Sequence, residues 1–400
     1  MWVMDPIRNP YTPNAGAAPA VLVGRDDQLN SFDLLLARLE RGRSEQSMII
    51  TGLRGVGKTV LLGRFRQAAM TAGWVVVEVE VSKHDEAGFR TLLASKLRTA
   101  LFELSPRAEW SDRIRRAMAV LKSFSLSADS SGSITAGLDV DAAEGLADHG
   151  YLDLDLTDLL VAVGEAAQDR GRGVVLLLDE VQFLDRPQLE AVIMALHKVV
   201  QRSLPITLVG AGLPQIAELA GDAKSYSERL FKFPAIGNLD DDEARQALLG
   251  PAEQEDATFT DQALDEALRI TGRYPYFLQE LGSAAWLAGD GNRIDLVAIQ
   301  ASHPVYLSKL DGSFFRVRID RCTNRQRQYM RAMAELGGDA QKAQDVAQVL
   351  GKQSNQVAPF RAELISMGLL YTPDHGYAAF TVPQFGEFLK RIEPTFSTGS

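Results

Sequence analysis

The residues most able to do chemistry form one eight-residue match to the pattern G-x-x-x-x-G-K-[ST], made of Gly52, Leu53, Arg54, Gly55, Val56, Gly57, Lys58 and Thr59. The glycines allow backbone conformations that a side chain would forbid, so successive N–H groups can turn around a phosphate. Lys58 supplies a mobile cation for the β- and γ-phosphates, and the Thr59 hydroxyl is placed to bind Mg²⁺. We interpret this segment as a phosphate-binding loop rather than a glycine-rich turn with a chance lysine.

Two carboxylates, Asp179 and Glu180, follow the apolar run 174–178. Beside a phosphate-binding loop, Asp179 would hold Mg²⁺ through water, and Glu180 would polarise the attacking water. Two acids at a strand end can also cap the next turn, but the loop favours the catalytic interpretation. The chain lacks the N-K-x-D motif of guanine-nucleotide-binding proteins, which favours ATP over GTP. Together with the acidic pair, this predicts hydrolysis of ATP to ADP with Mg²⁺.

Alternating strands and helices are expected to position these groups. The patterns predict helices at 58–72, 86–104 and 187–202, and strands at 47–51, 74–81, 173–179, 205–210 and near 231–236. The nearly uniform apolar character of 74–77 and 174–178 is typical of strands covered on both faces. The predicted fold class is therefore α/β, a parallel, three-layer nucleotide-binding base over residues 21–237.

An insertion and two flanking parts complete the predicted organisation. Alternation with period two in 124–128 and 134–138 predicts a β-hairpin near 122–140, either a local decoration or an arm that touches a substrate. The acidic residues after it, from 139 to 158, are interpreted as a solvated surface. Residues 1–20 contain four prolines, which predict an extended lead-in.

The last third of the chain is expected to be mainly helical. Residues 238–312 should form a small helical lid, with helices near 241–250, 260–271 and 275–288. Helices at 324–336, 343–350 and 354–367, followed by a hairpin around 373–376, predict a winged helix over 313–400.

Composition limits the class of protein. With 400 residues, 46% hydrophobic and 24% charged, the chain is expected to be a globular protein of about two to three domains. The single cysteine, Cys322, excludes an internal disulfide, and no apolar run is long enough to span a bilayer, so a cytoplasmic protein is expected. A net charge of −10 argues against a chain that coats nucleic acid but leaves room for one basic face.

The order of phosphate loop, acidic pair, strand, arginine, helical lid and winged helix resembles the AAA+ P-loop ATPases of the origin-recognition initiator clade and their STAND-like and archaeal ATPase relatives. The resemblance covers about residues 20 to 392. It implies that the turn Val23, Gly24 and Arg25 lies against the adenine. It also implies that Arg229 is an arginine finger acting in a homo-oligomer, and that Arg273 and Pro275 begin a lid helix that senses nucleotide.

One departure from the family concerns the end of strand 205–210. The family usually has a polar sensor there, whereas this chain has Gly-Ala-Gly-Leu-Pro at 210–214. The departure predicts slow hydrolysis and favours a slow switch.

A winged helix can place its third helix in the major groove of double-stranded DNA. The candidate DNA-binding residues are Lys352, Gln353, Ser354, Asn355, Gln356 and Arg361. Basic residues outnumber acidic ones in 321–391, but the wing tip 373–376 is not basic. Two functions therefore stay open: a switch whose nucleotide state positions the winged helix on DNA, and a STAND-like signalling or scaffold ATPase in which nucleotide controls protein–protein association.

Overall fold

The structure is a computed structural model that describes residues 4–83, 85–127 and 140–395. The chain folds as two compact units. We name them the sheet unit, Arg25–Gly52 with Lys58–Ile236, and the helical unit, Met1–Gly24 with Leu53–Gly57 and Gly237–Ser400. The tip of the phosphate loop, Leu53–Gly57, is therefore part of the helical unit.

The sheet unit is built on a parallel sheet of order β2-β3-β4-β1-β5. Its strands are β1 (Ser47–Thr51), β2 (Val75–Glu80), β3 (Val174–Asp179), β4 (Ile206–Gly212) and β5 (Phe231–Lys232). The strand β4 lies between β1 and β3, with Ile50 opposite Ala211 and Leu178 opposite Gly210. The segments that leave the carboxyl ends of β1 and β3 consequently start from the same edge of the sheet.

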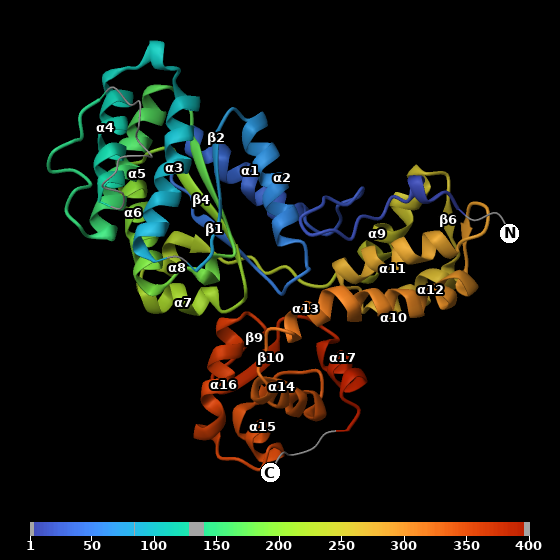
Figure 1. Ribbon diagram of the computed structural model, residues 1–400. Helices are drawn as coiled ribbons and strands as arrows, with labels where there is room; N and C mark the ends of the chain where they lie inside the picture. Colours follow the sequence, from blue (N-terminus) through green and yellow to red (C-terminus); the bar gives the residue numbers. More distant parts are fainter. Residues whose placement is uncertain (1–3, 84, 128–139, 396–400) are drawn as a thin grey trace. The chain divides into compact units, whose positions relative to one another are not determined.

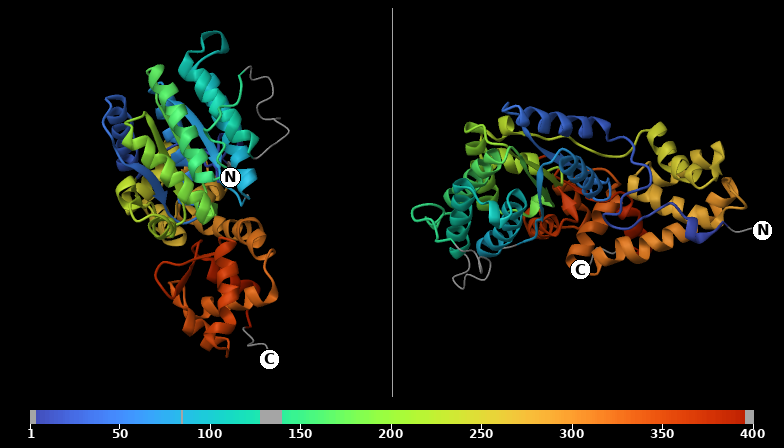
Figure 2. Two further views of the ribbon diagram at one scale, coloured as in Figure 1. Left: turned by 90° about the vertical axis from the view of Figure 1, so that its left-hand side faces the viewer. Right: turned by 90° about the horizontal axis from the view of Figure 1, so that it is seen from above.

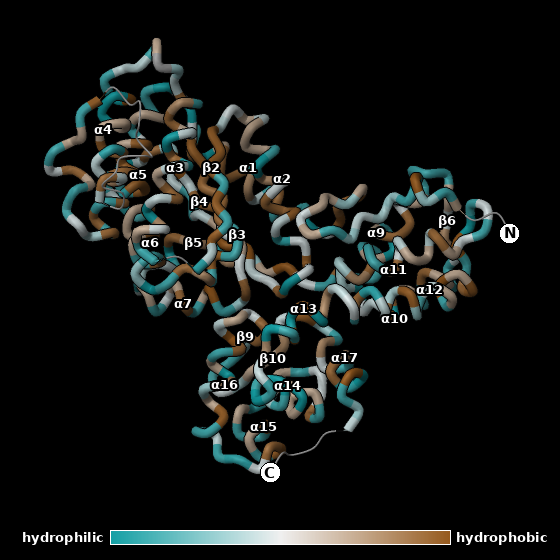
Figure 3. Tube along the Cα trace, viewed as in Figure 1, coloured by the Kyte–Doolittle hydropathy of each residue, from teal (hydrophilic) through white to brown (hydrophobic). Residues whose placement is uncertain are grey.

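Helices cover both faces of this sheet (Figures 1 and 2). One face carries α1 (Asp26–Glu40) and α2 (Lys58–Thr71); the other carries α3 (Glu86–Leu104), α4 (Asp112–Leu126), α5 (Leu152–Asp169) and α6 (Arg186–Gln201). The short helices α7 (Ile216–Ala223) and α8 (Ser227–Leu230) precede β5. Figure 3 shows the strands as a hydrophobic centre, as expected for a sheet buried on both faces. The α/β fold class is confirmed.

The prediction of a β-hairpin near 122–140 is wrong for its first strand. Residues up to Leu126 belong to α4, which buries Ile114, Met118, Leu121 and Phe124 at helical spacing. Five residues of apparent alternation at the end of a helix are too few to separate period two from period 3.6. Residues 128–139, which would have held the second strand, lie outside the described part of the chain.

The acidic stretch after the insertion is also not simply a solvated surface. Much of it forms α5, whose apolar positions face the core. Asp155 is fully buried and forms an ion pair with Arg90, 2.9 Å away. Arg90 also lies over the ring of Phe124 at 5.1 Å, so it joins α3, α4 and α5.

The helical unit begins with the N-terminal segment. Apart from one turn, η1 (Pro6–Arg8), the described residues 4–24 are irregular, but they pack against helices. The hydroxyl of Tyr11 donates to Leu248 O at 2.5 Å, and Trp286 Nε1 donates to Asp5 O at 2.8 Å. The partners belong to a set of helices made of α9 (Asp241–Gln254), α10 (Asp261–Thr271), α11 (Pro275–Ala288) and α12 (Leu296–Lys309), with strands β6 (Thr258–Phe259) and β7 (Arg293–Ile294).

The C-terminal part of the helical unit is a group of helices with a small antiparallel sheet. A turn of π-helix, η5 (Leu310–Phe315), leads into α13 (Arg316–Ile319), α14 (Asn324–Leu336), α15 (Ala343–Val349), α16 (Ser354–Ser366) and α17 (Phe385–Ile392). The sheet has the order β8 (Gln341–Lys342), β10 (Tyr377–Phe380), β9 (Leu370–Tyr371). We refer to residues 313–395 as the C-terminal domain.

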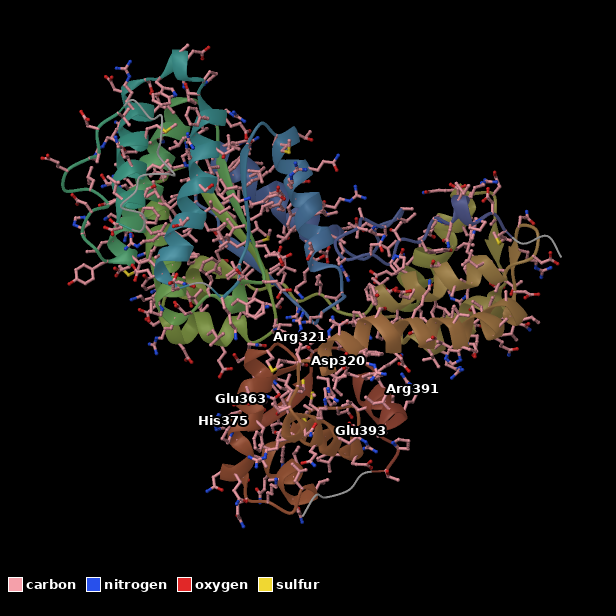
Figure 4. All side chains as sticks on the ribbon, in the orientation of Figure 1. Asp320, Arg321, Glu363, His375, Arg391 and Glu393 are labelled. Atoms are coloured by element: carbon pink, nitrogen blue, oxygen red, sulfur yellow. The ribbon has the colours of Figure 1, made fainter. Side chains whose placement is uncertain are left out.

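Side-chain contacts join elements in the C-terminal part of the helical unit, and Figure 4 labels one partner of each, Glu363 and Arg391. Gln326 donates to Glu363 at 2.8 Å, joining α14 to α16, and Arg391 pairs with Asp311 at 2.5 Å, joining α17 to η5. Within the described ranges, no helix combines the length and the apolar character that crossing a bilayer requires.

Candidate active site

The two predicted metal-binding side chains meet at the edge of the sheet. Thr59 is the second residue of α2, and Asp179 is the last residue of β3. The Thr59 hydroxyl donates to Asp179 Oδ2 at 2.6 Å. Hydroxyl and carboxylate oxygens are the hard donors that Mg²⁺ prefers, usually completed by water and substrate phosphates. The pair therefore fits a Mg²⁺ site.

Lys58 closes the phosphate loop at its base. Its side chain is only 8% exposed, and Nζ donates to Gly52 O at 2.9 Å. Gly52 N–H in turn donates to Gly212 O, at the end of β4, at 3.1 Å. The first residue of the loop is thereby bonded to the neighbouring strand and to the lysine near the end of the loop.

The tip of the loop is held within the helical unit. Gly55 and Gly57 have φ values of +89° and +95°, a region that favours glycine. Tyr276 N–H donates to Gly55 O at 3.2 Å, and the Tyr274 hydroxyl donates to Arg54 O. A Cβ at Gly55 would lie 3.1 Å from atoms of both tyrosines. The start of α11 therefore packs directly on the loop.

Arg54 connects the same tip to the C-terminal domain. Its N–H donates to Thr381 O at 3.1 Å, and its Nε donates to Gly368 O at 3.2 Å. Arg54 was predicted only as one member of a phosphate-binding loop. In the structure its backbone and side chain also bind carbonyl groups that follow α16 and β10.

Arg318 of α13 is a charged residue near this tip that sequence reasoning missed. It lies over the ring of Phe314 at 4.0 Å and donates to Phe314 O. Burial, and then the charge of Arg54, lower its pKa to about 10. The sequence gives no signal that Arg318 lies near Arg54, because the two residues are brought together only by the tertiary fold.

Glu180 has an unusual backbone. Its φ of 56° and ψ of 38° are left-handed, which is uncommon for a residue other than glycine and is often associated with functional sites. Its N–H donates to Asp179 Oδ1 at 2.8 Å, and its Oε2 accepts a hydrogen bond from the Gln182 amide. The predicted water-activating carboxylate is thus held by its own turn.

The other residues predicted from family resemblance lie in varied settings. In the sheet unit, Arg25 is buried at the start of α1, and Arg229 is exposed in α8. In the helical unit, Gly24 has φ +66° and lies close to Glu243, while Val23 is half-buried. Also in the helical unit, Pro275 is the first residue of α11, and Arg273 forms an exposed ion pair with Asp241 at 2.5 Å. Their adenine, finger and sensor roles stay predictions.

Three of the candidate DNA-binding residues form hydrogen bonds that hold α16 in place, and the other three lie at its start. Arg361 Nη2 donates to Tyr377 O at 2.6 Å, which fastens α16 to the hairpin. Gln353 and Gln356 form a reciprocal cap at the start of α16. The remaining three, Lys352, Ser354 and Asn355, are exposed at the same helix start.

Comparisons with known proteins agree with this geometry. Residues 21–209 match the family described as AAA ATPase domain, and residues 312–389 match a domain of unknown function (DUF8462). No curated protein matches the chain significantly.

Among solved structures, the chain is similar to a Walker-type ATPase of Pyrococcus abyssi, with 14% identity, a TM-score of 0.51, and coverage of 92% of this chain and 96% of that one. It is also similar to the Orc1 protein of Aeropyrum pernix in complex with DNA, with 15% identity, a TM-score of 0.47, and coverage of 93% and 94%. Cdc6p of Pyrobaculum aerophilum gives 14% identity, a TM-score of 0.47, and coverage of 99% and 100%. At 14% identity, the Pyrococcus match speaks for the fold alone.

The phosphate loop after β1 and the acidic pair after β3 lie within residues 21–209, the region that the family match covers. Residues 21–209 of this chain match the AAA ATPase domain family, and the geometry of the candidate site agrees with that match.

Proposed function

We propose that this protein is an ATP-binding, slowly hydrolysing and Mg²⁺-dependent molecular switch of the initiator-like AAA+ type. The observation that carries the proposal is the pairing of Thr59 with Asp179 at 2.6 Å, at the sheet edge where the phosphate loop begins. These hydroxyl and carboxylate oxygens would hold Mg²⁺ beside a bound nucleotide.

Each residue of the site has a stated role in the proposal. Lys58 and the backbone N–H groups of the loop bind the β- and γ-phosphates. Thr59, and Asp179 through water, would hold Mg²⁺, which would supply positive charge against the phosphates. Glu180 accepts a proton from the attacking water. Arg229 acts on the site of a neighbouring subunit, and Arg273 senses the nucleotide.

The switch part of the proposal is supported by the loop tip. Four hydrogen bonds link Arg54 and Gly55 to residues that begin α11 or follow α16 and β10. A nucleotide that reshapes the loop must change these bonds, because the backbone groups of the tip take part in them. Nucleotide state is thereby coupled to the lid and to the C-terminal domain.

We propose that the C-terminal domain is a winged helix and that double-stranded DNA is its partner. The supporting feature is the exposed start of α16, where Lys352, Ser354 and Asn355 can reach a phosphate or a base edge. Gln353, Gln356 and Arg361 serve chiefly to cap α16 and to fasten it to the hairpin.

A second candidate is a STAND-like signalling or scaffold ATPase whose nucleotide state controls self-association or binding to another protein. The observation in its favour is that Arg361, the one arginine among the candidate DNA-binding residues, bonds Tyr377 O within the domain. The loop 373–376 between β9 and β10 also lacks lysine and arginine.

The first experiment asks whether ATP is bound and hydrolysed. Purified protein is titrated with a fluorescent ATP analogue, and phosphate release is followed with and without Mg²⁺. We expect Lys58→Ala to lose nucleotide binding and Glu180→Gln to bind ATP but lose turnover. Equal turnover by Glu180→Gln and the unaltered protein would remove Glu180 from the mechanism.

The second experiment separates the two partners. Fluorescent duplex DNA is titrated with protein in ATP, in ADP and as Lys58→Ala, at two salt concentrations. Binding that weakens with salt and depends on nucleotide supports DNA, because phosphate contacts release counterions. If no state binds DNA while ATP changes the oligomeric mass measured by light scattering, the second candidate is the function.

A further inference from the structure

The carboxylate of Glu180 accepts a hydrogen bond from a side chain that the proposed mechanism does not use. Gln182 lies in the short helix η4 (Val181–Phe183), directly after the acidic pair. Its Nε2 donates to Glu180 Oε2, and its Oε1 accepts the N–H of Leu213 at 3.1 Å. Only one orientation of the amide satisfies both partners, because the Leu213 N–H must donate and the carboxylate must accept. The amide of Gln182 is therefore fixed at both ends.

Gly212 leaves the space that this amide occupies. A Cβ at position 212 would lie 2.9 Å from Gln182 Oε1 and 2.8 Å from Val181 Cγ2, distances that real Cβ atoms essentially never show. Gly212 is the last residue of β4, and its carbonyl accepts the N–H of Gly52, the first residue of the phosphate loop. The Gln182 amide thus links the carboxylate of Glu180 to the segment that leaves β4. That segment is in turn bonded to the phosphate loop.

We propose that Gln182 is a positioning residue for ATP hydrolysis, which supplies from η4 the polar group that the sequence lacks at the end of β4. The inference rests on the proposed role of Glu180 as the acceptor of a proton from water. Anchoring one carboxylate oxygen restricts rotation of the group and keeps its other oxygen in one direction. The left-handed backbone of Glu180 adds to the need for an anchor, since a strained conformation persists only where neighbours determine it.

The test measures steady-state kcat and KM for ATP with the full-length protein. We expect Gln182→Leu to lower kcat by about tenfold to a hundredfold, the usual effect of a misplaced catalytic group, with KM and the nucleotide dissociation constant unchanged. Gln201→Leu is the matched control, because Gln201 is exposed at the end of α6 and its amide contacts the His197 ring at 3.5 Å, away from the acidic pair. This control should leave kcat unchanged.

A second pair of variants moves the amide without deleting it. Gly212→Ala introduces a Cβ into the space of Gln182 Oε1 and should lower kcat in the same way. Gly221→Ala in α7 adds the same methyl group where nothing lies within 4 Å, and it should have no effect. This pair keeps the proposal testable if Gln182→Leu fails to fold.

A cycle with Glu180→Gln separates this inference from the proposed function. If Gln182 acts through Glu180, the double variant should be no slower than Glu180→Gln alone. An unaltered protein without ATP turnover, or a Glu180→Gln variant with full turnover, would overturn the proposed function and this role with it. Loss of turnover in Glu180→Gln but unchanged or faster turnover in Gln182→Leu and Gly212→Ala would overturn the role of Gln182 alone.

Discussion

The link between the phosphate loop and the C-terminal domain can be tested at Gly368. This buried residue follows α16 with φ +70°, where replacing glycine by alanine costs about 1 kcal/mol. A Cβ there would lie 2.6 Å from Arg54 Nη2, so the guanidinium must move away from the Gly368 carbonyl that its Nε binds at 3.2 Å. Loss of that hydrogen bond adds about 1 to 1.5 kcal/mol. We expect Gly368→Ala to destabilise the C-terminal domain by about 2 to 2.5 kcal/mol in total.

The matched control is Gly351→Ala, at the end of α15. Gly351 has φ +64°, similar to that of Gly368, but nothing lies within 4 Å of its Cβ position. This substitution should cost only the conformational part, about 1 kcal/mol. Opening free energies are measured by native-state hydrogen exchange with mass spectrometry, on peptides that cover 364–372 and 346–353. Local exchange is preferred to a global melt because the chain contains two compact units.

The double variant completes the test. In an Arg54→Ala background, Gly368→Ala should cost no more than Gly351→Ala, because the clash and the hydrogen bond are both gone. The reasoning is refuted if Gly368→Ala and Gly351→Ala cost the same in the unaltered background, or if removal of Arg54 leaves their difference unchanged.

Three other outcomes are expected. Asp155→Ala should destabilise the sheet unit by about 3 kcal/mol in urea unfolding, because the buried Arg90 loses its buried partner and keeps the ion pair with the exposed Glu86, whereas a paired Arg90→Met and Asp155→Leu change should restore most of the loss; equal cost for the single and the double change would contradict this. Burial raises the pKa of the Tyr274 hydroxyl, which therefore stays a donor, so Tyr274→Phe should change ATP affinity while Tyr276→Phe, whose hydroxyl bonds a glutamate, should not. Burial also raises the pKa of the Cys322 thiol, so iodoacetamide at pH 8 should modify it far more slowly in native protein than in urea.

The parts of the fold that the sequence predicts well are those with strong local signals. The expected helices 86–104 and 275–288 agree with α3 and α11 to the residue. The uniform apolar run of β3 gave the right strand because a strand buried on both faces needs no alternation. The α5 helix was missed, since its acidic residues obscured apolar positions at helical spacing, and α12 and α17 were missed as well.

The sequence predicts a set of candidate site residues but not the connections between them. Glycine, lysine and threonine at fixed spacing predict ligands for phosphate and Mg²⁺, because that pattern is local in the chain. The bonds of Arg54 to Thr381 and Gly368 join residues more than 300 positions apart, and no local pattern encodes them. Gln182 was visible in the sequence, but its meaning depends on the missing Cβ of Gly212 in another strand.

The left-handed backbone of Glu180 implies a conflict between stability and catalysis at a single position. Glycine adopts φ 56° without strain, so Glu180→Gly should gain about 1 kcal/mol from the backbone even though it removes the carboxylate. Selection for stability alone would favour glycine there, and selection for turnover would favour glutamate. A Glu180→Gly protein that is more resistant to unfolding and inactive as an ATPase would show that the chain retains strain at this turn for the sake of chemistry.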